Sequence, residues 1–83
     1  MAQQLYIDLT WTPNTEPDLA GYNVYRRVAD EAPVKINVDL VKTPSFRDTN
    51  VKAGTKYFYS VSAVDLRNNE SQKSVEASET VPP

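Results

Sequence analysis

The chain has 83 residues, enough for one small domain with a thin stability margin, and 40% of them are hydrophobic. It has no cysteine and no histidine, which excludes disulfide bonds, a thiolate metal cage and the commonest general base. Nine Lys and Arg against eleven Asp and Glu give a net charge of −2 with both signs scattered, so no nucleic-acid surface is indicated. The apolar runs are too short for membrane insertion.

The first predicted strand is Leu5–Thr12, in which every second residue is large and apolar: Leu5, Ile7, Leu9 and Trp11. Pro13 ends it, because proline cannot donate to a strand ladder. The segment Pro13–Gly21 consists of turn-forming residues and is expected to be a loop, with Leu19 packing back on the end of the core.

The second predicted strand, Tyr22–Val28, places Tyr22 and Val24 inward, with Arg26 a weaker inward candidate. Three of its residues point outward: Asn23, Tyr25 and Arg27. After a polar connector, Val34–Asn37 is expected to be a short edge strand with Ile36 inward.

The next segment, Val38–Thr43, stays ambiguous, with either Leu40 or Val41 reaching the core. Pro44–Asp48 is expected to be another short strand, which Phe46 would anchor in the apolar interior.

The stretch Lys52–Asp65 predicts a Gly-centred turn followed by the strand around which the others are arranged. One face of this strand carries Tyr57, Tyr59, Val61 and Ala63, and the other carries Phe58, Ser60, Ser62 and Val64. A polar hairpin loop, Leu66–Ser71, leads to a closing strand, Ser74–Val81, whose apolar side is Val75, Ala77 and Val81. About six short strands without a helical period indicate an all-β sandwich.

Four pieces of the chain resemble a fibronectin type III domain, and together they cover nearly all of it. They are Trp11 at the end of its strand, Tyr22–Tyr25, the Gly-Thr-containing run Val51–Tyr57, and Val61–Asp65 with the following Asn69–Ser71. The resemblance implies an immunoglobulin-like sandwich of two antiparallel sheets in a single domain, residues 1–83. Residues 1–4 would precede the first strand, and Pro82–Pro83 would form a stiff exit.

The family pattern also implies a set of core residues and a tyrosine corner. The core set is Trp11, Tyr22, Val24, Ile36, Phe46, Val51, Tyr57, Tyr59, Val61 and Ala63. In the corner, the hydroxyl of Tyr57 is expected to donate to a backbone carbonyl in the Val51–Lys52 segment, which pins the crossover between the sheets.

One departure from the family concerns its first strand, which normally precedes the strand that carries the tryptophan. Four extended residues ahead of Leu5 reach about 13 Å at most, too little for a reversal and a pairing strand. The strand Leu5–Thr12 would then have a free edge without Pro or Lys, which predicts self-association through this edge.

No catalytic, cofactor or metal site is indicated. Serines have no histidine to activate them, and the carboxylates lie in or beside turns, where aspartate caps backbone amides. The oxygens of Asp65 and Asn68–Glu70 match no calcium motif. We therefore expect a protein that is not an enzyme.

A binding face remains as an alternative. Tyr25, Phe58 and Val64 lie on the outward faces of two neighbouring strands, and exposed aromatic rings can stack on sugars or on a protein. The competing interpretation is that long side chains such as Arg27 cover these rings. Two loops, Pro13–Ala20 and Leu66–Ser71, form another candidate contact surface at one end.

The preferred hypothesis is a non-catalytic spacer or interaction module within a larger protein, whose partners are neighbouring domains. Because the sequence resembles modules of bacterial secreted and surface proteins, an extracellular location is implied. The alternative is a recognition module that binds a polysaccharide or protein.

Overall fold

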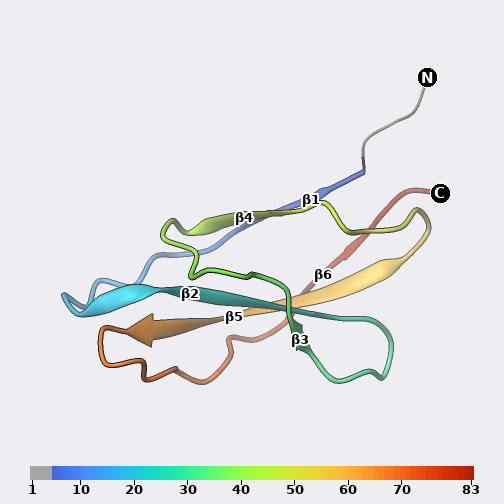
Figure 1. The fold of residues 1–83 in the computed structure, drawn as a ribbon. Coiled ribbons are helices and arrows are strands. Elements are labelled where there is room, and N and C mark those ends of the chain that lie inside the picture. The colour runs from blue at the N-terminus through green and yellow to red at the C-terminus, as the bar shows by residue number, and fades with distance from the viewer. Residues whose placement is uncertain (1–4) are drawn as a thin grey trace.

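The chain folds into a two-layer antiparallel sandwich, which confirms the predicted fold class (Figure 1). The computed structural model describes residues 5–83, so the interpretation of residues 1–4 lies outside it. Its strands are β1 (Ile7–Thr10), β2 (Leu19–Arg27), β3 (Val34–Lys35), β4 (Ser45–Asp48), β5 (Lys56–Asp65) and β6 (Ala77–Thr80). One layer is β1-β4 and the other is β3-β2-β5-β6. Across residues 5–83 no helix is long and apolar enough to cross a membrane.

The strand β5 lies at the centre of the larger sheet. It is 10 residues long and pairs with β2 along one side and with β6 along the other. Its turn from β4 contains Gly54, whose φ of 74° is favourable for glycine, and the Gly54 amide donates to the Val81 carbonyl at 2.8 Å. The turn is therefore tied to the end of β6.

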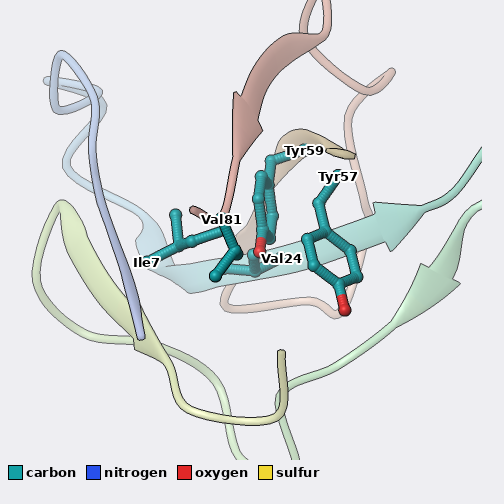
Figure 2. Close-up of a cluster of buried hydrophobic side chains, with 5 residues drawn as sticks. All are labelled: Ile7, Val24, Tyr57, Tyr59 and Val81. Carbon is teal, nitrogen blue, oxygen red and sulfur yellow. The ribbon is translucent and has the colours of Figure 1, made fainter. Parts of the chain in front are cut away.

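The core lies between the layers and has a small buried centre, whose side chains are drawn in Figure 2. That centre consists of Ile7, Val24, Tyr57, Tyr59 and Val81. Around it pack the half-buried Leu5, Leu9, Trp11, Val28, Ile36, Val41, Phe46, Val51 and Val61. Of the remaining core candidates, Tyr22 is buried and packs edge-on against the Trp11 ring, with 5.2 Å between the ring centroids. Ala63 is half-buried outside this cluster.

The end of the predicted first loop belongs instead to β2. Leu19 and Gly21 pair with Asp65 and Val64, with a register shift between them. A Cβ atom on Gly21 would lie 2.9 Å from the Cβ of Leu40, so a larger residue here would displace the neighbouring segment. The absence of a side chain at Gly21 permits this close approach. Leu19–Gly21 belong to a strand, so the loop prediction for these residues was wrong.

The predicted closing strand is shorter than expected, because β6 begins only at Ala77. Before it, the hydroxyls of Ser71 and Ser74 accept hydrogen bonds from the backbone amides of Ala63 and Val61. These side chains occupy positions that carbonyls of a regular strand would take. Val75 is 92% exposed in this irregular segment, so its predicted place on the apolar side was wrong.

A buried ion pair joins the two layers at Asp48, whose side chain is 4% exposed. The carboxylate lies 2.8 Å from Nη1 of Arg26 on β2 and accepts a hydrogen bond from the Tyr59 hydroxyl on β5 at 2.8 Å. It also accepts the Asn50 amide at 3.1 Å, the turn-capping role expected for it. Burial, reinforced by the bond to Asp48, raises the pKa of the Tyr59 phenol.

The tyrosine corner forms at Tyr57, but its hydrogen bond runs in the opposite direction from the one predicted. The Tyr57 hydroxyl accepts the Lys52 backbone N–H at 2.8 Å. The ring is 5% exposed. The corner therefore satisfies an amide donor of the β4–β5 turn rather than a carbonyl.

Replacing Tyr57 with phenylalanine is expected to lower the free energy of unfolding by about 1–2 kcal/mol, because the Lys52 amide loses its acceptor while the ring stays packed. Urea denaturation of both proteins followed by circular dichroism measures the difference. An unchanged midpoint and slope would show that the corner contributes nothing to stability.

Candidate binding face

The two outward aromatic rings come from neighbouring strands of the larger sheet. Tyr25 on β2 lies opposite Ser60, and Phe58 on β5 lies opposite Arg27. The two rings are thus diagonal neighbours on one face. Both residues are half-buried even though, within residues 5–83, no second sheet covers this side.

Cationic side chains cover the Phe58 ring. The guanidinium carbon of Arg27 is 4.2 Å from the ring centroid, and Nζ of Lys56 is 5.3 Å from it. Glu76 holds Arg27 in this position with two hydrogen bonds of 2.6 Å. This ion pair lowers the pKa of the Glu76 carboxyl.

The Tyr25 ring is covered in the same way from the segment that follows β5. Nζ of Lys73 lies 4.4 Å from the ring centroid. The Tyr25 hydroxyl and the Ser62 hydroxyl both donate to the Glu70 carboxylate. These bonds, first from Ser62 and then from Tyr25, lower the pKa of Glu70, while burial and then the bond to Glu70 raise the pKa of Tyr25.

The third residue of the predicted face is not on a surface at all. Val64 is 3% exposed, so its assignment to an open binding face was wrong. It pairs with Gly21, and the side chain of Leu40 lies against that glycine and shares a hollow with Val64. The strand alternation gave the correct side of the sheet but could not show the loop that covers it.

The end loops form hydrogen bonds with each other and with the sheet. The Asn14 amide donates to the Tyr22 hydroxyl at 2.8 Å, and the Leu66 amide donates to the Asp18 carbonyl at 2.9 Å. Asp65 accepts the backbone and side-chain N–H groups of Asn69 and the Arg67 amide, which lowers its pKa. Its oxygens are thereby engaged in the turn.

Between these loops lies an open hollow of about 330 Å³ with carboxylates on its rim. Within residues 5–83 no three His, Cys, Asp or Glu side chains are grouped so that they could hold a metal ion. The hollow is therefore not a candidate metal centre.

Two residues that shape this face, Lys73 and Glu76, were not singled out by the sequence. Glu76 lies in the segment predicted as the closing strand, and Lys73 directly precedes that segment, so neither was expected to reach the outward aromatic rings. Their charges were visible, but only the irregular path of the segment brings both over β2.

The fold has a close structural counterpart among solved proteins, although no family profile matches the sequence. An Fn3-like protein from Clostridium thermocellum superposes with a TM-score of 0.76 and 34% identity, over 94% of this chain and 78% of that one. This chain belongs to the fibronectin type III-like family. A β-1,2-glucanase from Parabacteroides distasonis contains a similar domain, with a TM-score of 0.77, 29% identity and 94% of this chain covered.

Relatives of this fibronectin type III-like domain are small parts of large enzymes. An amylopullulanase from Thermoanaerobacterium saccharolyticum is 37% identical over 70 residues, which is 84% of this chain and 5% of the enzyme. An exo-β-1,2-glucooligosaccharide sophorohydrolase from Parabacteroides distasonis is 30% identical over 82 residues, 99% of this chain and 11% of that enzyme. The domain thus spans a small fraction of each enzyme that it matches.

Proposed function

We propose that this domain is a non-catalytic accessory module of a larger extracellular glycoside hydrolase, in which it spaces and braces neighbouring domains. The observation that carries the proposal is the covering of Tyr25 and Phe58 by cations of the same chain. A ring that already stacks on a guanidinium or ammonium group presents no free face to a sugar. The small share of each related enzyme that the domain matches supports the same role.

Catalysis by this domain has no support in the arrangement of its carboxylates. Glycoside hydrolysis needs two carboxyl groups facing each other across a bound sugar. Asp48 is engaged by Arg26 and Tyr59, and Glu70 by Tyr25 and Ser62. Asp65 is held by its own turn. Each of these three carboxylates has a structural role, which supports a mechanical rather than a chemical function.

The recognition alternative is tested with the purified domain and insoluble glycans. We expect the wild type and a Tyr25→Ala, Phe58→Ala double variant to remain equally in the supernatant with insoluble starch or β-1,2-glucan. We also expect neither protein to release reducing sugar. Retention of the wild type with loss of retention in the double variant would establish carbohydrate recognition and overturn the proposal.

A matched variant, Arg27→Ala with Lys56→Ala and Lys73→Ala, uncovers both rings without removing them. If the cations are what prevents stacking, this variant gains retention on glycans that the wild type lacks. Circular dichroism of each variant checks that the fold is kept.

A further inference from the structure

One edge of the smaller layer has no partner among residues 5–83. β1 pairs with β4 on one side only. The Trp11 amide donates toward β4, to the Pro44 carbonyl at 3.1 Å. Because backbone groups alternate along an antiparallel strand, those of Asp8 and Thr10 point away from β4, along the open edge. This edge contains neither Pro nor Lys between Leu5 and Thr12, the residues that natural edges use to prevent pairing.

A hollow near the end of β1 shows that the smaller layer leaves part of the larger one uncovered. It has a volume of about 310 Å³, and its walls include Trp11, Val61, Ser71 and Ser74. The indole Nε1 of Trp11 is shielded from solvent and has no hydrogen-bond acceptor within the described part of the chain. A buried donor without an acceptor is costly, so the packing at this end of β1 is incomplete within the described residues.

We propose that β1 pairs with β1 of a second copy of this chain, antiparallel and about a twofold axis at Leu9. This places Leu9 opposite Leu9, and Asp8 of each copy opposite Thr10 of the other. The Asp8 and Thr10 backbone groups, which point along the open edges, then form the hydrogen-bonded pairs. The two small layers join as β4-β1-β1-β4.

The register follows from which residues can face each other. Around Leu9, Ile7 meets Trp11, so every apolar side chain stays on the inner side of the joined layer. A twofold axis at Asp8 would place two carboxylates directly opposite each other, which is unfavourable. A shift by one residue would turn the apolar set of one copy toward solvent. With the axis at Leu9 the strand is therefore complementary to itself, and a second copy is the occupant that fits it.

The test changes the charge at Thr10, an exposed position opposite Asp8 of the other copy. Thr10→Lys introduces an opposite charge and is expected to tighten the dimer, whereas Thr10→Asp introduces a like charge and is expected to weaken it. With two such pairs in each dimer, the dissociation constant should change by about 2- to 30-fold in each direction. The gain with Lys should be at the small end, because Arg47 already pairs with Asp8 at 2.7 Å.

Sedimentation equilibrium over a range of concentrations measures association, and Trp11 emission reports it independently because the chain has one tryptophan. Thr10→Pro removes an amide from the open edge and should abolish the dimer while circular dichroism stays unchanged. A wild-type chain that stays monomeric at millimolar concentration overturns the proposal. Equal effects of Thr10→Lys and Thr10→Asp overturn the register.

A second test measures hydrogen exchange in a longer polypeptide that contains this domain. If the Asp8 and Thr10 amides are protected from hydrogen exchange there while the protein is monomeric, the edge is occupied by a preceding segment of the same chain. That result would also overturn pairing with a second copy. Neither outcome bears on the accessory role, which depends on the opposite face of the larger sheet.

Discussion

Replacing Asp48 with alanine is expected to lower the free energy of unfolding by about 3–5 kcal/mol, the largest effect of any single substitution considered for this domain. The change leaves the Arg26 guanidinium without its carboxylate and the Tyr59 hydroxyl without its acceptor. Because the Arg26 side chain is 20% exposed, water can partly replace the lost partner, which favours the lower end of the range.

Chemical denaturation measures this loss, at a protein concentration low enough that the chain is monomeric. Asp8→Ala is the matched control, because it breaks the pair with Arg47 on the surface, where both side chains are more than half exposed. We expect no measurable change in its denaturation midpoint. If the two aspartate variants lose the same stability, the ion pair between the layers is not a determinant of the fold.

Replacing Trp11 with alanine is expected to cost about 3 kcal/mol. The substitution removes the edge-on contact with the Tyr22 ring and opens the core beside an existing hollow. Trp11 is half-buried rather than enclosed, so we expect a loss at the low end of the range for large aromatic residues in cores.

Trp11→Phe separates the loss of a ring from the loss of the indole N–H. Since Nε1 has no acceptor among the described residues, its removal should cost nothing, and the phenylalanine ring retains much of the contact with Tyr22. We expect a loss of about 1 kcal/mol. Urea unfolding followed by far-ultraviolet circular dichroism compares the variants, and a phenylalanine variant as unstable as the alanine one would contradict this account.

Alternation along single strands predicted much of the fold. The inward positions of Ile7 and Tyr59 follow from a period of two, and both are buried. The same rule placed Tyr25 and Phe58 on the other side of the larger sheet, where the structure has them. The rule fails at Val75, where the chain leaves regular strand geometry. At Leu19–Gly21 the error was of another kind, because turn-forming residues predicted a loop where β2 has already begun.

The sequence could not show that Tyr25 and Phe58 are covered, because the covering groups come from elsewhere in the chain. Lys73 and Glu76 reach β2 across β5 only because the segment before β6 pairs through serine hydroxyls. Similarly, Val64 is buried beside the place where Leu40 lies close to Gly21, an approach that depends on the glycine. Contacts of this kind have no local signature.

By itself, the sequence determined the all-β class, the central strand and the apolar side of most strands, since these depend on residue type and on spacing within a few residues. Only the tertiary structure decided that Asp48 joins the layers, that the Tyr57 hydroxyl accepts rather than donates, and that the candidate binding face is closed by its own cations. Those features depend on which distant segments meet. Which distant segments come into contact is determined by the packing of the whole core, in which buried polar groups need hydrogen-bond partners.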